Sequence, residues 1–138
     1  MSVERKLAYR GERFKIAFAR DHDGTFPGEM FFDQLPKPDK AKLMKLFTIL
    51  ADHGNHSNPE KFGDLGDGLY EFKSFQIRMP FAYSSDEKGL VLISHGFFKK
   101  SPRTPKSEIN RAKIILRNDS SSSKVCAINE HNTKRKRL

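Results

Sequence analysis

Two short apolar segments separated by only two residues constrain the fold more than any other feature of this sequence. Residues 69–74 and 77–83 alternate between apolar and polar side chains, as strands with one buried face do. The connection Phe75-Gln76 is long enough only for a tight turn between antiparallel neighbours. The sequence therefore predicts a β-hairpin in the middle of the chain.

One register of this hairpin keeps its apolar side chains together. In that register Phe72 lies opposite Met79, and Tyr70 lies opposite Phe81. A shift of one residue would turn one strand over and separate these pairs, so the register is well specified. The other face of the hairpin then carries Glu71, Lys73, Arg78 and Pro80.

The polar face places two cations opposite each other. Lys73 faces Arg78, and like charges in that position cost a few tenths to about 1 kcal/mol. An anion held between the two side chains would remove this cost, whereas the alternative is a solvated face whose long side chains reach water. Pro80 lacks a backbone N–H, so its strand is expected to lie at a sheet edge or to contain a bulge.

Apolar periodicity and helix-end signals predict the other elements of the chain. The stretch 55–68 is rich in Gly, Asn and Asp and is expected to be a loop. A strand, two helices, a third strand of a β-meander and a last helix are predicted at residues 13–19, 28–35, 38–53, 90–95 and 104–118. The predicted fold class is therefore α+β, a mostly antiparallel sheet with helices on one face. The predicted core is Phe14, Ile16, Phe47, Leu50, Phe72, Met79, Phe81, Leu92 and Ile115.

Length and charge indicate one domain with a polyanionic partner. The 138 residues suffice for a single core, predicted over 1–118, and the Ser-rich, basic segment 119–138 is predicted to be a flexible tail. The net charge of +9 favours a partner such as nucleic acid. One cysteine, Cys126, and the lack of a long apolar run predict a cytoplasmic protein with no membrane contact.

The second half of the chain resembles a known protein family. The run "GLYEFKS…QIRMPFAY…KGLVLISHGFFKKSPRTPKSEINRAKIIL" is similar to the RelE/ParE toxin superfamily, and most similar to its HigB-like, phage-derived branch. The match covers residues 65–117, and the first half agrees in the order of its elements. The resemblance implies a RelE-like fold, in which a strand and two helices precede an antiparallel β-meander and a C-terminal helix.

The resemblance also implies an activity, partners and a site. The activity is that of a toxin–antitoxin toxin that cleaves mRNA on the ribosome, and the expected partners are mRNA, the ribosome and a helix-turn-helix antitoxin. The residues that match the family's catalytic positions are Lys73, Arg78, Lys99 and His95. Those that match its RNA phosphate contacts are Lys100 and Arg103. No cofactor and no metal are expected.

Cleavage of this kind needs a base for the attacking 2′-OH, an acid for the leaving 5′-oxygen, and cations for the charge that develops on the phosphoryl oxygens. Arginine suits the last role because its guanidinium binds phosphate through two N–H groups and stays charged. Two other functions stay open. A toxin of this fold could inhibit a topoisomerase such as gyrase without cutting RNA, and a nuclease-dead chain could bind RNA or antitoxin only.

Two further motifs are interpreted as structural. His53 and His56 have a spacing that metal ligands can have, but they lie in a Gly- and Asn-rich segment without cysteine and are expected to be loop residues. Ser94-His95 lacks the turn and the third partner of a hydrolytic nucleophile, so it is expected to be a polar pair at the end of a strand.

Overall fold

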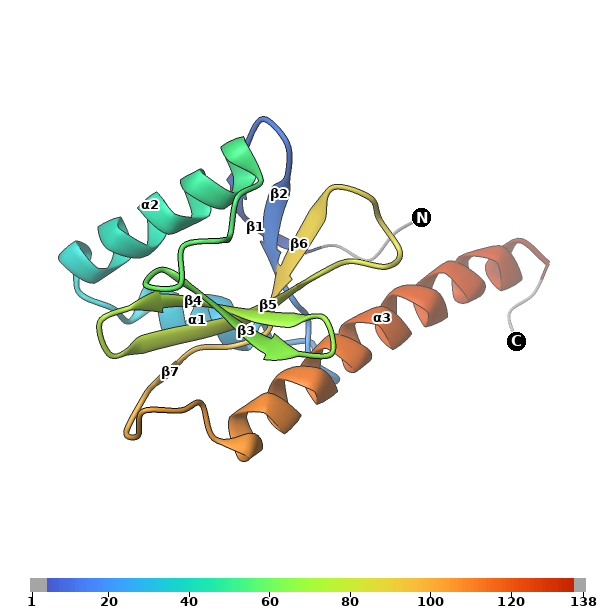
Figure 1. Cartoon of the computed structure of the whole chain (residues 1–138). Helices are drawn as coiled ribbons and strands as arrows, with labels where there is room; N and C mark the ends of the chain where they lie inside the picture. The colour runs from blue at the N-terminus through green and yellow to red at the C-terminus, as the bar shows by residue number, and fades with distance from the viewer. Residues whose placement is uncertain (1–4, 136–138) are drawn as a thin grey trace.

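The computed structural model describes residues 5–135, and side chains up to Ser120. Over these residues it forms a single mixed sheet with helices on both faces (Figure 1). The elements in chain order are β1 (Lys6–Arg10), β2 (Lys15–Phe18), α1 (Pro27–Asp33), α2 (Lys37–His53), β3 (Phe62–Gly66), β4 (Leu69–Ser74), β5 (Ile77–Tyr83), β6 (Leu90–Ile93), β7 (Phe97–Phe98) and α3 (Lys106–Arg135). The α+β class and the predicted order of elements are confirmed.

The sheet has the strand order β1-β2-β6-β5-β4-β3, and β7 pairs with β5 beside this path. Neighbouring strands are antiparallel except β2 and β6, which are parallel and pair Ile16 with Val91. The sequence did not predict β1, β3 or β7. In particular, residues 62–66 lie in the segment expected to be a loop, but they pair with β4 as a strand.

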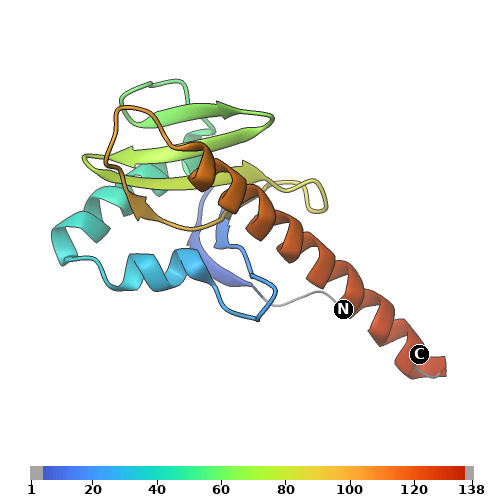
Figure 2. The ribbon, with the colours of Figure 1, turned by 90° about the horizontal axis from the view of Figure 1, so that it is seen from below.

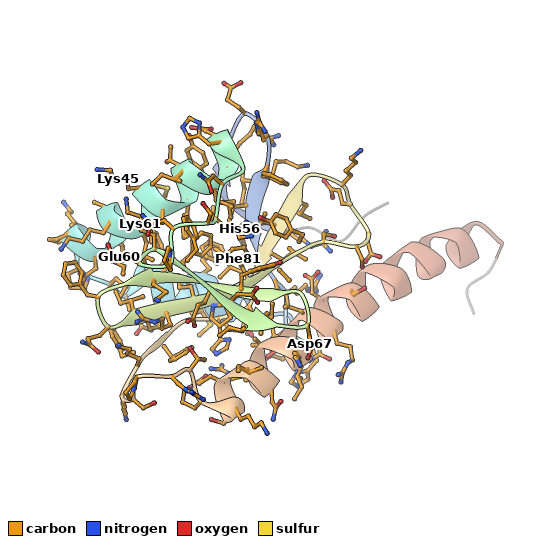
Figure 3. All side chains as sticks on the ribbon, in the orientation of Figure 1. Lys45, His56, Glu60, Lys61, Asp67 and Phe81 are labelled. Carbon is orange, nitrogen blue, oxygen red and sulfur yellow. The ribbon has the colours of Figure 1, made fainter. Side chains whose placement is uncertain are left out.

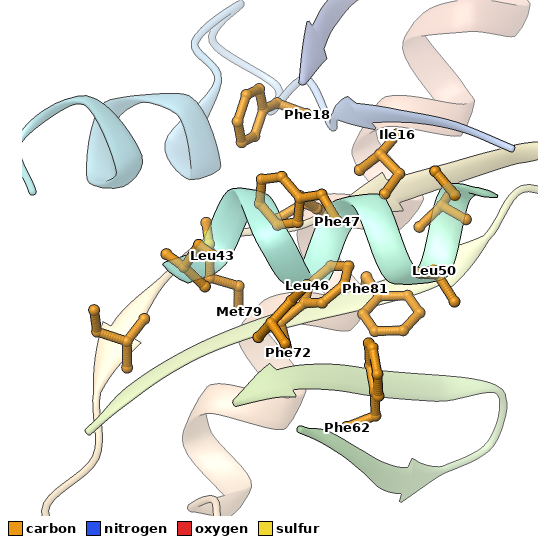
Figure 4. Packing of buried hydrophobic residues seen from close by; sticks show 14 of the residues in the cluster. Ile16, Phe18, Leu43, Leu46, Phe47, Leu50, Phe62, Phe72, Met79 and Phe81 are labelled. Carbon is orange, nitrogen blue, oxygen red and sulfur yellow. The ribbon is translucent and has the colours of Figure 1, made fainter. Parts of the chain in front are cut away.

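Helix α2 covers one face of the sheet and supplies five of the fifteen buried residues of the larger core (Figure 4). Its apolar residues recur every three or four positions, so Leu43, Phe47 and Leu50 share one side of the helix and are fully buried. Phe47 meets Phe72 of β4 edge-on, with 4.9 Å between ring centroids. Gly54 ends the helix in the left-handed conformation (φ 70°), a common helix stop.

Helix α3 packs on the opposite face, so the expectation that all helices share one face is wrong. Its Ile115 is buried with Ala17 of β2 and Leu92 of β6 in a second, smaller core. Figure 2 shows α3 crossing the sheet on the side away from α1 and α2 and continuing beyond it. All predicted core residues are buried except Phe14, which is half-buried against the larger core.

The hairpin of β4 and β5 has the predicted register. Phe72 pairs with Met79, and Lys73 pairs with Arg78. Pro80 lies in a central strand, so the expected edge or bulge is wrong there. A two-residue turn makes Ser74 and Ile77 a hydrogen-bonded pair, which puts Pro80 at a position where its nitrogen faces away from β4. On the edge of β5 away from β4, the partner strand changes at Pro80 from β7 to β6. The missing N–H therefore interrupts no row of backbone hydrogen bonds with either strand.

The C-terminal part of α3 overlaps the segment 119–138 that was predicted to be a flexible tail. The backbone of α3 is helical to Arg135, and residues 136–138 lie outside the described part of the chain. Asp119 is fully buried and its carboxylate lies 2.7 Å from Nη2 of Arg5. Asp119 therefore belongs to the folded body, and the flexibility of the residues after it stays a prediction.

Candidate functional site

A groove with a volume of about 820 Å³ lies at the edge of the sheet beside β3 and β4. Three segments line it: the connection from α2 to β3, the β3–β4 hairpin, and the connection from β7 to the start of α3. The connection from α2 crosses above β4 in Figure 1, and His56 is labelled at this place in Figure 3. The groove thus borders the predicted polar face of the hairpin at Glu71 and Lys73 and also reaches Tyr70 of the opposite face.

Two of the predicted cations line this groove. Lys73 of β4 is half-buried and donates a hydrogen bond from Nζ to the carbonyl oxygen of Pro59 at 2.8 Å. Arg103 is exposed at the groove's edge, on the connection to α3. These two side chains come from segments about thirty residues apart in the chain and line the same hollow.

The floor of the groove carries a buried carboxylate. Glu71 is 5% exposed, and its Oε1 accepts a hydrogen bond from Thr104 Oγ1 at 2.8 Å. This bond fixes the start of the α3 connection against β4. Gly63 of β3 leaves room for the same carboxylate, because a Cβ there would come within 2.9 Å of Glu71 Oε2.

His56 is a groove residue that the sequence analysis assigned only to a loop. Its Nδ1 lies 2.9 Å from the hydroxyl of Tyr83, and its ring packs on Tyr70 with 4.7 Å between centroids. Burial, and secondarily the neighbouring Tyr70, raises the pKa of Tyr83, so that hydroxyl keeps its proton at neutral pH. The contact depends on strands distant in sequence, so the local spacing of the histidines gave no signal for it.

Arg78 is buried, so it does not belong to a solvated face whose side chains reach water. It lies on the polar face as expected, but only 7% of the residue is exposed. Its Nη1 donates to the carbonyl oxygens of Phe75 at 2.7 Å and Ile77 at 2.8 Å, and its Nε lies 3.9 Å from Glu71 Oε2. Arg78 therefore holds the turn of its own hairpin. The carbonyl oxygen of Pro59 offsets the charge of Lys73, and the carbonyl oxygens in the hairpin turn offset that of Arg78.

His95 is buried as well, with 1% of the residue exposed. Its Nε2 lies 2.8 Å from Glu108 Oε1 and its Nδ1 lies 3.0 Å from Ser94 Oγ. Burial lowers the pKa of His95, the hydrogen bond to Glu108 opposes this shift, and the charge of Arg111 adds to it. A neutral ring donates from Nε2 to Glu108, while the single proton of the Ser94 hydroxyl is shared between His95 Nδ1 and the carbonyl oxygen of Pro80, 3.2 Å away. The pair Ser94-His95 thus ties the end of β6 to α3, and Ser94 itself is fully buried.

The remaining predicted cations follow β7. The backbone N–H of Lys99 donates to the carbonyl oxygen of Gln76 at 2.7 Å, which places Lys99 beside the β4–β5 turn. Lys99 is half-buried and Lys100 is exposed, and neither lines the groove. The structure therefore brings Lys73 and Arg103 to one hollow and leaves Lys99 and Lys100 on the adjacent surface.

The described part of the chain contains neither a metal-binding cluster nor a membrane-spanning helix. There, no group of three or more His, Cys, Asp or Glu side chains is arranged to hold a metal ion. Among the helices described, none combines the length and the apolar character needed to cross a membrane.

A family model matches more than half of the chain. No curated protein matches the chain. The family model described as "Phage derived protein Gp49-like (DUF891)" matches residues 30–117, which span α2, the β3–β7 region with the whole groove, and the part of α3 that packs on the sheet. The chain therefore belongs to the phage-derived Gp49-like family, a family known in toxin–antitoxin systems.

Proposed function

We propose that this protein is the toxin of a toxin–antitoxin pair and that it cleaves mRNA on the ribosome in the groove beside β4. The observation that carries the proposal is the groove itself, which Lys73 of β4, Arg103 of the connection to α3 and His56 of the connection from α2 all line. The match to a toxin–antitoxin family and the net charge of +9 support it. A helix-turn-helix antitoxin is the partner proposed to neutralise it.

The proposed reaction is an attack by the 2′-OH of one nucleotide on the adjacent phosphorus. A bond forms between the 2′-oxygen and phosphorus while the bond from phosphorus to the 5′-oxygen breaks, leaving a cyclic phosphate and a free 5′-OH. Lys73 and Arg103 stabilise the negative charge on the phosphoryl oxygens. His56 takes the proton of the attacking 2′-OH at Nε2, since Nδ1 contacts Tyr83, and water supplies the proton for the leaving 5′-oxygen. These steps use no metal.

The other predicted residues take roles that fit their positions. We propose that Arg78 is a positioning residue, because it holds the β4–β5 turn and faces the Glu71 carboxylate rather than the groove's opening. His95 is proposed to anchor α3 through Glu108 instead of acting on RNA. Lys99 and Lys100 are proposed to contact RNA phosphates outside the groove.

The test is primer extension on translated mRNA with wild type and three single variants, Lys73→Ala, Arg103→Ala and His56→Ala. Loss of the general acid or base lowers a rate by about 10²–10⁴-fold, so His56→Ala should leave almost no cuts. Lys88→Ala is the matched control, because Lys88 is an exposed lysine of the β5–β6 connection outside the groove. Its cuts should equal those of wild type.

Two results would contradict the proposal in different ways. Cuts that persist in all three groove variants would move the site elsewhere on the molecule. An absence of cuts with wild-type protein that binds ribosomes would remove the nuclease activity and favour a chain that only binds RNA or antitoxin.

A further inference from the structure

Phe75, in the turn between β4 and β5, combines exposure with an unfavourable backbone. It is 75% exposed, the most exposed of the large hydrophobic residues described. Its φ of 56° lies in the left-handed region, which is a genuine outlier for a bulky side chain. Glycine or asparagine would fill this turn position without that cost, so neither packing nor turn geometry explains a phenylalanine here.

The surface beside Phe75 is strongly basic. A second hollow of about 470 Å³ lies there, lined by Phe75 and Leu46, by Ser74 and Glu60, and by the lysines Lys42, Lys45, Lys61 and Lys73. Nζ of Lys42 stands over the Phe75 ring, 4.4 Å from its centroid. In Figure 3, Lys45 of α2 and Lys61 lie on the same side of the molecule, with Glu60 beside them. Four ammonium groups against one carboxylate call for an anionic ligand.

We propose that this hollow binds single-stranded RNA, with a base stacked on the Phe75 ring and the backbone phosphates on Lys42, Lys45 and Lys61. An aromatic side chain that presents its face beside a row of cations is the arrangement with which proteins hold single strands without reading their sequence. An isolated phosphate would need only the lysines, and an apolar ligand would need only Phe75. The two features together select a ligand that alternates flat rings with negative charge.

This hollow is joined to the groove by Lys73, which lines both. A strand whose scissile phosphate lies at Lys73 and Arg103 can therefore continue toward Phe75. The inference rests on the proposed function only in taking RNA as the ligand. It adds a positioning surface that fixes the nucleotides next to the scissile phosphate.

The test measures binding, so it does not depend on cleavage. The probe is a short oligoadenylate that is 2′-O-methylated, which blocks attack by the 2′-oxygen, and that carries one 2-aminopurine, whose fluorescence falls when it stacks. Phe75→Leu keeps an apolar side chain but removes the stacking face. Loss of one stacked base should weaken binding by about 5- to 100-fold and abolish the fluorescence change.

Two matched pairs of variants locate the effect. Phe98→Leu makes the same change at an exposed phenylalanine that packs on Phe31 outside the hollow, and it should keep wild-type affinity. Lys42→Gln should lower the slope of log affinity against log salt by about 0.7, the value for one phosphate contact to a single strand. Lys88→Gln, the same change outside the hollow, should leave the slope unaltered.

Affinity of Phe75→Leu equal to wild type, or an equal loss in Phe98→Leu, would overturn the proposal. So would an oligoglutamate peptide that binds as tightly as the RNA probe and loses the same factor in Phe75→Leu, because the surface would then dock an acidic protein segment. Phe75-dependent binding by a protein that leaves translated mRNA uncut would support this inference and contradict the nuclease. Cleavage with Phe75-independent binding would do the reverse.

Discussion

At the scale of single residues, Phe75 lowers folding stability at a position where we propose that it binds RNA. A non-glycine residue in the left-handed region costs about 1 kcal/mol or more. The ring returns part of this through its contact with Lys42, which is worth about 0.5–1 kcal/mol at an exposed site. The side chain therefore contributes little net stability where it stands.

We expect Phe75→Gly to raise the free energy of unfolding by up to about 1 kcal/mol, because glycine adopts this turn conformation without strain. Urea unfolding followed by circular dichroism measures the change. Phe75→Leu is the control and should not gain stability, since leucine keeps the strain. A Phe75→Gly protein less stable than Phe75→Leu would show that the backbone at this turn is unstrained.

His95 makes stability depend on pH. Its pKa is lowered in the folded state, mainly by burial, so the unfolded chain binds more protons as pH falls through the ordinary histidine range near 6.5. The contribution of His95 is therefore present above that pH and is lost as pH falls toward the folded pKa. We expect unfolding free energy to decrease from pH 7.5 to 5.5 and to do so less steeply in His95→Gln. Equal slopes in both proteins would contradict this origin.

The residue pairs of the hairpin could be predicted from sequence because turn length and alternation are local properties. The burial of Arg78 could not, since β7 pairs beside it in the sheet and the position of β7 does not follow from the hairpin's own residues. His56 was missed for the same reason, because its partners Tyr70 and Tyr83 lie on strands that follow it in the chain.

At the scale of elements, α3 is fixed to the sheet by buried polar contacts as well as by Ile115. The Asp119 carboxylate accepts from the guanidinium of Arg5 at 2.7 Å and from the backbone N–H of Arg20 at 2.8 Å. The side chains of Asp119 and Arg5 are 0% and 11% exposed. Another ion pair, between Lys113 of α3 and Asp67 of the β3–β4 turn, lies at the surface.

We expect Asp119→Ala to destabilise the fold by about 3–5 kcal/mol, because it leaves the Arg5 guanidinium buried without its partner. Lys113→Ala should change stability little, since solvent already screens the exposed Asp67. Chemical denaturation of both variants gives the comparison. A similar loss in the two proteins would mean that exposure does not distinguish these ion pairs.

Element prediction failed for the short strands β1, β3 and β7. The segment Phe-Gly-Asp-Leu-Gly of β3 contains two glycines and an aspartate, and its strand form depends on pairing with β4. Strand β1 begins and ends with a charged residue and pairs only with β2. Both lie at sheet edges, where composition is a weak guide. The placement of α3 on the second face could not be predicted either, because one amphipathic stripe fits either side of a sheet.

At the scale of the whole molecule, the described side-chain contacts of α3 with the body extend as far as Ser120, whose Oγ donates to Asp86 Oδ2 at 2.9 Å. The segment after it carries five basic residues against one acidic residue, Glu130. This segment therefore holds a large part of the net charge, while the contacts that define the core precede it.

We expect a chain of residues 1–120 to unfold cooperatively at nearly the same urea midpoint as the full chain, since it keeps every core residue among the described side chains. Its affinity for single-stranded RNA should be lower and less dependent on salt, because fewer cations displace counterions. Equilibrium unfolding and a salt titration test both parts. A clear fall in the midpoint would place stabilising contacts beyond Ser120.

The parallel pairing of β2 with β6 also determines how much of the chain must be synthesised before the sheet can be completed. Lys15 of β2 pairs with Leu90 of β6, so β2 has no partner strand on that side until most of the chain has left the ribosome. Closing such a long loop costs entropy before any contact repays it, which makes this step slow. A message cut or abandoned before residue 93 therefore yields a chain without a completed sheet. If the protein acts on translated mRNA, each molecule becomes active only after its own translation is nearly finished.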